Sequence, residues 1–142
     1  MLCPEEISKF IKENKVAAVC YIKDALPHCF NCLYACMPDA GGVIFKSSKS
    51  SLHSTTLQHD VAVAGTIYYS SKSGLDNAGI QFCGRIVTDK TLSDIAEKAY
   101  YKRYPLALLI PGELFVVMFD NLKFTRTMKG IRQKYNWEKA LN

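Results

Sequence analysis

Apolar and polar residues alternate along several short segments of this chain, which is the period of a half-buried β-strand. In residues 79–88, Ile80, Phe82 and Ile86 would face one side, while Gln81 would face the other. The same kind of pattern, with turn residues between the segments, predicts strands at 16–22, 28–37, 43–46, 61–69, 79–88, 113–119 and 122–125.

Two segments have the spacing of amphipathic helices instead. The first covers residues 4–14. The second runs to about Arg103, and Thr91 with Asp94 resembles a capping box at its start. We also expect a last helix near Trp137.

Strands that cluster in hairpins, without a regular alternation of strand and helix, predict a mainly β protein. We expect an antiparallel β-barrel of six to seven strands with two to four flanking helices. Gly84 indicates a bulge or a close backbone approach, and residues 120–121 read as the turn between the last two strands. The 142 residues fit one domain, 1–142.

The segment 28–37 carries few charges on either face, which predicts a strand covered on both sides. It also holds Cys29, Cys32 and Cys36 beside His28. Strand alternation places Cys29 on the opposite face from the other three side chains, so we expect no metal site. We interpret the six cysteines as reduced core residues: Cys3, Cys20, Cys29, Cys32, Cys36 and Cys83.

A run of hydroxyls and cations follows the strand at 43–46 and opens a short helix-like segment. Helix N-termini, hydroxyls and lysines all favour an anion, and a phosphate monoester fits best. Serine-rich turns also cap helices for purely structural reasons, so both interpretations stay open. The residues concerned are Lys46, Ser47, Ser48, Lys49, Ser50 and Ser51.

The net charge of +5 is concentrated in residues 123–142, which hold six Lys and Arg against Glu138. A basic tail is compatible with nucleic acid, an anionic cofactor or a solvated surface, and we do not expect nucleic acid. No apolar run reaches the roughly 20 residues of a membrane span. The N-terminus is acidic and lacks an apolar signal core, so we expect a soluble cytoplasmic protein with no membrane contact.

Four short motifs carry a resemblance that extends over nearly the whole chain. They are AVAGT at 62–66, GIQFCG at 79–84, KAYYKRYP at 98–105 and KFT at 123–125. In this order and spacing, the chain resembles the split-barrel flavin-binding proteins related to pyridoxamine 5′-phosphate oxidase. Within them it is most similar to small bacterial proteins of uncharacterised function.

The resemblance implies a homodimer that binds FMN at the subunit interface. It assigns the phosphate to the loop residues 46–51 together with His53. It places the isoalloxazine ring against two strands, at His28, Cys29, Phe30 and Asn31 and at Val43, Ile44 and Phe45. It suggests contacts from the partner subunit at Gln81, Arg85, Arg126 and Trp137.

The relatives often carry a basic residue two or three positions after Ser50, where this chain has Leu52 and His53. The residues that bind vitamin B6 phosphates are not recognisable, so substrate and electron donor stay open. The resemblance therefore implies an FMN-dependent oxidoreductase acting on an unknown small molecule. The alternative is a non-catalytic module that binds a flavin, haem or another phosphorylated ligand.

Overall fold

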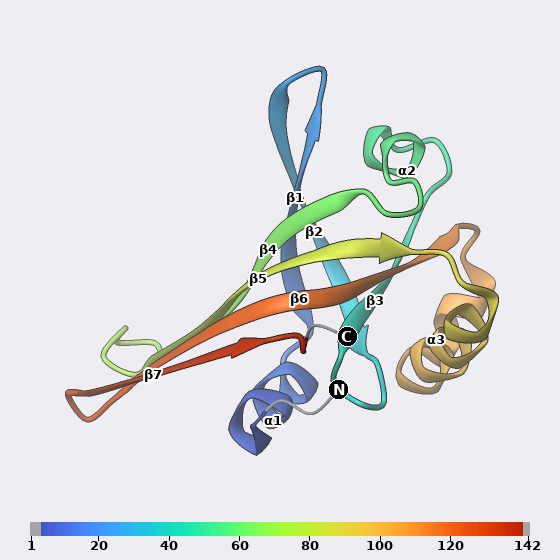
Figure 1. Cartoon of the computed structure of the whole chain (residues 1–142). Helices are drawn as coiled ribbons and strands as arrows, with labels where there is room; N and C mark the ends of the chain where they lie inside the picture. Colours follow the sequence, from blue (N-terminus) through green and yellow to red (C-terminus); the bar gives the residue numbers. More distant parts are fainter. Residues whose placement is uncertain (1–3, 141–142) are drawn as a thin grey trace.

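The computed structural model describes residues 4–140 of the chain. Its seven antiparallel strands form one sheet in the order β3-β2-β1-β4-β5-β6-β7 (Figure 1). The strands are β1 (Val16–Lys23), β2 (Leu26–Cys36), β3 (Gly42–Ser47), β4 (Ala62–Ser70), β5 (Asn77–Val87), β6 (Glu113–Met128) and β7 (Ile131–Glu138). The helices are α1 (Glu5–Glu13), α2 (Leu52–Thr56), α3 (Lys90–Arg103) and the 3-10 helix η1 (Pro105–Leu109).

An additional pairing between β3 and β6 closes β1 to β6 into a ring, and β7 extends beyond it as the second arm of a hairpin. Gly42 lies at this seam, opposite Met118. A Cβ atom at Gly42 would lie 2.2 Å from the carbonyl oxygen of Val117, so a side chain there would push the two strands apart. The predicted antiparallel β-barrel with flanking helices is confirmed.

Two apolar cores lie on opposite faces of the sheet where β2, β3 and β6 meet. Val43 and Phe45 point into the core inside the barrel, together with side chains of α1. Ile44, between them, points into a second core beneath α3. Because successive side chains of β3 point to opposite faces of the sheet, this one strand contributes to both cores.

Tyr34 of β2 connects both long helices to the barrel. Its hydroxyl donates a hydrogen bond of 2.7 Å to the carbonyl oxygen of Ile11 in α1. Its own carbonyl oxygen accepts from the Arg103 guanidinium at 3.1 Å and from the Tyr104 hydroxyl at 2.6 Å. Two residues of the motif at 98–105 therefore anchor the end of α3.

A strand does form in the region predicted at 28–37. The prediction that both of its faces are buried holds for only part of it. Residues 34–36 pack between the two cores. Leu33 and Leu26, by contrast, are 53% and 61% exposed. The reason is that the inner core covers only one face of this part of β2, through Phe30 and Cys32, and leaves Leu33 on the other face exposed. Leu26 lies at the end of the β1–β2 hairpin that projects past the rest of the barrel (Figure 1).

The two predictions for the C-terminal region are wrong. Residues 120–121 form no turn, because β6 is one strand from Glu113 to Met128. Cys83 and Gly84 of β5 pair with Asn121 and Phe119, so the register shifts there and Asp120 of β6 is left as the extra residue. Residues near Trp137 form β7 instead of a helix. Lys129 and Gly130 both have positive φ angles, of 51° and 79°, which is the backbone of a tight hairpin turn.

The predicted cap of α3 also needs correction. The helix begins at Lys90, and the carboxylate of Asp89 accepts a hydrogen bond from the Leu92 N–H at 3.1 Å. Thr91 therefore lies inside the first turn. Its side chain comes after the position from which a residue caps the helix.

The interpretation of the cysteines as core residues is wrong for three of them. Cys20, Cys29 and Cys83 are exposed, because they occupy strand positions that face away from the barrel interior. Cys32 and Cys36 are partly buried against the inner core. Cys3 lies outside the described residues.

Within residues 4–140, no group of three or more His, Cys, Asp or Glu side chains is placed to hold a metal ion. None of the helices in this part of the chain is long and apolar enough to cross a membrane.

Candidate functional site

A cleft of about 350 Å³ lies where the projecting part of β2 meets the end of β3. Helix α2 and the segment after α3 close its sides. Residues from four separate stretches line it: Phe30, Asn31, Cys32, Leu33, Phe45, Lys46, Ser47, Ser48, His53, Tyr100, Ala107, Ile110 and Pro111. None of these residues is acidic, which leaves the cleft suited to an anion.

Stacked rings form one wall of this cleft. The imidazole of His53 lies parallel to the ring of Phe30, with 3.8 Å between centroids and 10° between planes. Phe30 in turn packs on Phe45 with its centroid 5.4 Å away. The wall therefore offers a flat aromatic surface at the edge of the inner core.

His53 also contacts the hydroxyl-rich loop of residues 46–51, which we call the serine loop. Its Nε2 is hydrogen-bonded to the Ser47 hydroxyl. The Ser51 hydroxyl lies 3.3 Å from that of Ser47. Burial lowers the pKa of His53 from its ordinary value of 6.5, so the ring is neutral at pH 7. A neutral imidazole between a hydroxyl and a phenyl ring positions Ser47 without adding a fixed charge.

The other serines of the loop are bonded among themselves. The hydroxyls of Ser48 and Ser50 are 2.9 Å apart, and the Ser54 hydroxyl donates to the carbonyl oxygen of Ser48 at 2.6 Å. Helix α2 has only five residues and no side-chain cap at Ser51. Anion affinity at this loop must therefore come from hydroxyls and cations, because so short a helix has little dipole.

The two lysines of the loop have different surroundings. Lys46 donates a hydrogen bond of 2.7 Å to the carbonyl oxygen of Ala107, and its ammonium lies 5.0 Å from the centroid of the Tyr101 ring. Lys49 is exposed and makes no hydrogen bond or ion pair within the described part of the chain. Lys46 thus holds the segment after α3 against the loop, and Lys49 is available to a ligand.

The remaining residues that the resemblance assigned to the flavin ring have other positions. His28 stacks on Tyr21 with 5.4 Å between centroids, next to the aromatic wall. Cys29 is exposed on the opposite face of β2. The side chains of Val43 and Ile44 are fully buried, so they contribute only the backbone of β3.

The residues proposed to act across a subunit interface do not line the cleft of their own chain. Gln81 is exposed on the outer face of β5. Arg126 lies 5.2 Å over the Phe124 ring, and Trp137 packs partly buried against the inner core. Contact with a ligand from these three positions requires a second copy of the chain.

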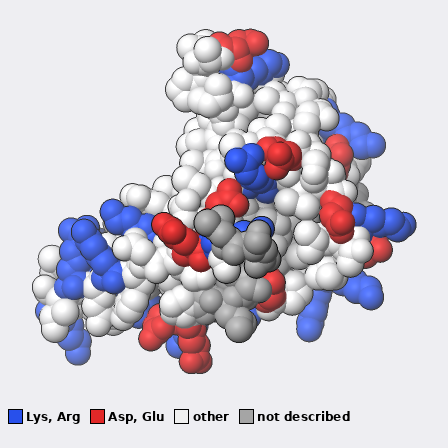
Figure 2. Space-filling view, in the orientation of Figure 1, with Lys and Arg blue, Asp and Glu red and all other residues white. Residues whose placement is uncertain are grey.

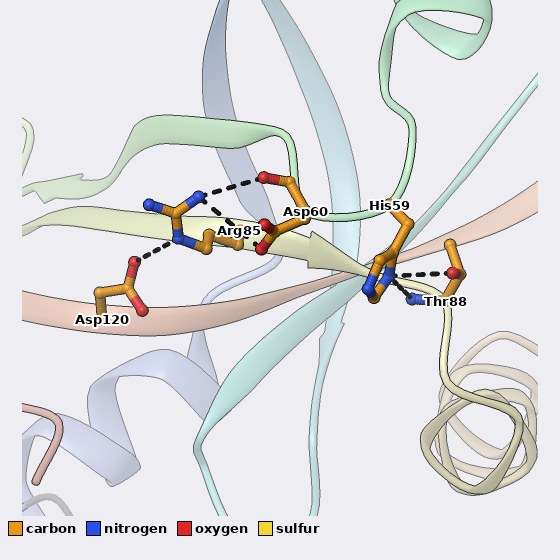
Figure 3. Close-up of polar contacts among 5 residues, drawn as sticks. All are labelled: His59, Asp60, Arg85, Thr88 and Asp120. Carbon is orange, nitrogen blue, oxygen red and sulfur yellow. Dashed lines mark hydrogen bonds and ion pairs between the residues drawn. The ribbon is translucent and has the colours of Figure 1, made fainter. Parts of the chain in front are cut away.

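Arg85 is held between two aspartates (Figure 3). Its guanidinium donates to the Asp60 carbonyl oxygen at 3.1 Å and lies 3.6 Å from a carboxylate oxygen of Asp120. Beside it, Nδ1 of His59 accepts a hydrogen bond from the Thr88 N–H at 3.1 Å. These contacts tie the loop before β4 to β5 and β6, and we assign them a structural role.

Sequence reasoning missed the segment after α3 and the residues Cys32, Leu33 and Tyr100. The signal was present, since residues 106–110 form an apolar run between two prolines. Leu109 is 81% exposed, although it belongs to this run. Burial raises the pKa of Cys32 to about 12, so its thiol stays protonated beside the cleft.

Three larger hollows lie elsewhere on the described residues. One, of about 500 Å³ beneath α3, is lined by Glu97 and Glu113, which would repel a phosphate. Two others, of about 460 and 640 Å³, have no acidic residue and contain basic ones: Arg132 in the first, and Lys12, Lys98, Lys102 and Arg103 in the second. None of the three is lined by the serine loop, residues 46–51.

Basic side chains gather at the end of the β6–β7 hairpin, well away from the barrel (Figure 2). The residues of the basic tail follow this hairpin: Lys123, Arg126, Lys129, Arg132, Lys134 and Lys139. Part of the net charge thus lies at the end of this hairpin, and the rest is distributed along its two strands.

No family model matches this chain. Among curated proteins it is similar to the UPF0306 protein YhbP of Salmonella arizonae, with 29% identity over 134 residues that cover 92% of this chain and 90% of the relative. The predicted similarity to small bacterial proteins is confirmed.

Solved structures with the same arrangement of strands include a haem-binding protein from Mycobacterium smegmatis, with a TM-score of 0.72 and 13% identity over 95% of this chain and 59% of that one. An FAD-binding protein from the same organism has a TM-score of 0.69 and 14% identity over 89% and 96% of the two chains. This chain has the split-barrel fold. A pyridoxamine 5′-phosphate oxidase-like protein from Corynebacterium glutamicum also shares the split barrel, with a TM-score of 0.58 and 10% identity over 89% and 90%.

Proposed function

We propose that this split-barrel protein binds a flavin, with FMN as the first choice, in the cleft between β2, β3, α2 and the segment after α3. The proposal rests on two contacts of His53: its ring stacks on Phe30, and its Nε2 is hydrogen-bonded to the Ser47 hydroxyl. They place a flat aromatic wall next to a hydroxyl-rich loop, and FMN combines a flat ring with a phosphate monoester.

The phosphate end fits the loop residues. Ser47 and Ser48 line the cleft and supply neutral donors, while Lys49 supplies a cation that has no other partner in residues 4–140. Gly112 keeps the loop close to the segment after α3, because a Cβ there would lie 2.9 Å from the Ser47 carbonyl oxygen. This packing holds the loop in shape before a ligand arrives.

The ring end fits the strand residues. Phe30 and Phe45 provide apolar surface, and Asn31 provides amide donors and an acceptor next to it. Pockets for cofactors commonly combine apolar walls with a few polar groups in this way. The volume of about 350 Å³ in one chain is at the small end for such pockets, so a second copy of the chain would complete the site.

We propose that the second copy is a homodimer partner. Three apolar side chains of the segment beside the cleft are largely exposed in the single chain: Leu108 is 65%, Leu109 is 81% and Ile110 is 61% exposed. An exposed apolar run next to a binding site is typical of a surface that another protein covers. The partner would also bring Gln81, Arg126 or Trp137 within reach of the ligand.

A bound flavin supplies hydride and electron transfer, so the chain needs no catalytic nucleophile of its own. The residues of this chain would bind the phosphate, orient the ring and keep water from it. We infer an oxidoreductase that acts on an unidentified small molecule in the cytoplasm. The haem-binding and FAD-binding proteins of the same fold support a non-catalytic binding module as the second candidate.

The first test is the visible spectrum of freshly purified protein, followed by titration of the colourless fraction with FMN, FAD, riboflavin and haemin in parallel. We expect FMN to bind more tightly than riboflavin, because the loop holds the phosphate. The Ser47→Ala variant should lose this preference. Ser73→Ala, in the exposed β4–β5 loop, is the matched control and should keep it.

Each outcome separates the candidates. FMN binding with turnover of NADH or NADPH supports the oxidoreductase, and FMN binding without turnover of any donor favours the binding module. A Soret band with haemin and no flavin response would replace the flavin by haem. Equal affinity for FMN and riboflavin would mean that the serine loop is only structural.

A further inference from the structure

Two thiols face each other on the outer surface of the projecting β1–β2 hairpin. Cys20 of β1 is paired directly with Cys29 of β2 in the strand register. Their Sγ atoms are 3.2 Å apart, and both residues are exposed. Neither residue lines the proposed flavin cleft.

The backbone of an antiparallel pair suits a disulfide at such a position. Directly opposed residues have Cα atoms about 4.5 to 5.5 Å apart, and disulfides span about 4.4 to 6.8 Å between Cα atoms. The two side chains already point to the same face with their sulfurs in contact. Closing the bond needs side-chain rotation and little movement of the strands.

No other described cysteine has a cysteine opposite it. Cys83, which is equally exposed, is paired with Ala64 on one side and Asn121 on the other. Cys32 is paired with Ala17 and is partly buried. Within residues 4–140, the strand register therefore singles out one pair for cross-linking.

We propose that Cys20 and Cys29 form a reversible cross-strand disulfide through exchange with a low-molecular-weight disulfide. The thiolate of one cysteine attacks a sulfur of the small disulfide and releases one small thiol. The second cysteine then attacks the protein sulfur of this mixed disulfide and releases the second small thiol. Two protein thiols are oxidised and one small disulfide is reduced, so that atoms and electrons balance.

The contact between the two sulfurs serves both steps of the exchange. Whichever thiol attacks first, the other lies 3.2 Å away and can resolve the mixed disulfide. The product would join the two strands of the hairpin that carries Phe30, the residue after Cys29.

The experiment incubates the full chain with excess oxidised glutathione and counts the remaining thiols under denaturing conditions. We expect Cys20 and Cys29 to lose their thiols without either carrying a glutathione adduct, and all six thiols to return after dithiothreitol. Trypsin should release the peptide 16–23 linked to the peptide 24–46, because Lys15, Lys23 and Lys46 bound them. Thermal unfolding of each variant below checks that it is folded.

Variants identify the two sulfurs. Cys20→Ser should stop at a mixed disulfide on Cys29, while Cys29→Ser should block the cross-link. Cys83→Ser is the matched control, since this exposed residue has no cysteine opposite it among the described strands, and it should keep the Cys20–Cys29 cross-link. Cys32→Ser should also leave the cross-link intact.

Three outcomes would overturn the proposal: six thiols that persist, a glutathione adduct on Cys20 or Cys29 as the end product of the unmodified chain, or a cross-link that survives in Cys20→Ser. A band of twice the chain mass on a non-reducing gel would also overturn it, because the cysteines would then join two copies across an interface. None of these results depends on whether the cleft binds a flavin, so the two proposals fail separately.

Discussion

His53 is the residue at which burial, ring stacking and hydrogen bonding meet. Its imidazole lies on Phe30 and is bonded to Ser47, and burial lowers its pKa from 6.5. Protonation would place a positive charge on a partly buried imidazole, where water solvates it poorly. The structure therefore favours the neutral ring, in which the stack and the serine contact coexist.

This lowered pKa predicts how stability changes with pH. Below pH 6.5 the unfolded chain binds a proton at His53 that the native chain does not bind, so the free energy of unfolding falls as the pH decreases. The fall from this residue should stop below the native pKa. Histidine NMR titration, with His53→Gln to assign the signal, checks it; a midpoint at or above 6.5 would contradict the prediction.

The two loop lysines should separate stability from ligand binding. Lys46→Ala removes the bond to Ala107 and should lower the free energy of unfolding by about 1 kcal/mol. Lys49→Ala should leave unfolding unchanged and weaken FMN about three- to five-fold, since an exposed charge pair contributes at most about 1 kcal/mol.

Urea unfolding and parallel titrations with FMN and riboflavin measure both effects of the lysine variants. Riboflavin, which has no phosphate, should bind Lys49→Ala as it binds the unmodified chain. Reversed roles, with Lys46→Ala affecting FMN alone, would show that Lys46 leaves Ala107 to bind the ligand.

Among the elements, α3 begins two residues earlier than its predicted cap implies: Asp89 caps the helix in place of Thr91. Both Asp89 and Thr91 are good capping residues by type, and Thr91 has an acidic residue three positions later. The structure selects Asp89, whose carboxylate reaches the Leu92 N–H. The chain enters the helix at the end of β5, and this entry point decides which residue becomes the cap.

We predict that Asp89→Ala lowers the free energy of unfolding by about 1 kcal/mol, because it removes this cap. Thr91→Ala is the matched control and should change it by less than about 0.5 kcal/mol, as other exposed helix positions do. Urea unfolding compares the two. If Thr91→Ala lowered the free energy of unfolding more than Asp89→Ala, Thr91 would be the capping residue, as the sequence predicts.

For the molecule as a whole, the proposed site and the proposed homodimer are linked. The cleft is small, and an apolar segment beside it is exposed. Both features are accounted for if a second copy covers the segment and closes the cleft. Affinity for the ligand should then depend on the oligomeric state.

We predict that Leu109→Glu shifts a dimer toward monomer and weakens FMN at the same time. The side chain is 81% exposed in the single chain, so the fold itself should be unaffected. Leu75→Glu, at a residue 75% exposed in the β4–β5 loop, is the control. Light scattering after gel filtration gives the mass; a dimer that persists in Leu109→Glu would place the interface elsewhere.

Much of the cleft was predictable from sequence, and the reason is local. Phe30, Asn31, Phe45, Lys46, Ser47 and Ser48 lie on β2 and at the end of β3, and His53 follows on α2. The other side of the cleft comes from Ala107, Ile110 and Pro111, about 60 residues further along the chain. Only the position of α3 brings them to the loop, through contacts such as the one from Lys46 to Ala107 at 2.7 Å.

The sequence by itself determined the positions of β1 to β5, the outward and inward faces of most strands, and the residue types of the serine loop, because alternation and residue type act over a few residues. The tertiary structure alone decided the closure of β3 on β6, the fate of the C-terminal region as β7, and the exposure of the hairpin that carries Cys20 and Cys29. These depend on contacts between residues far apart in the chain, whose formation no local pattern specifies.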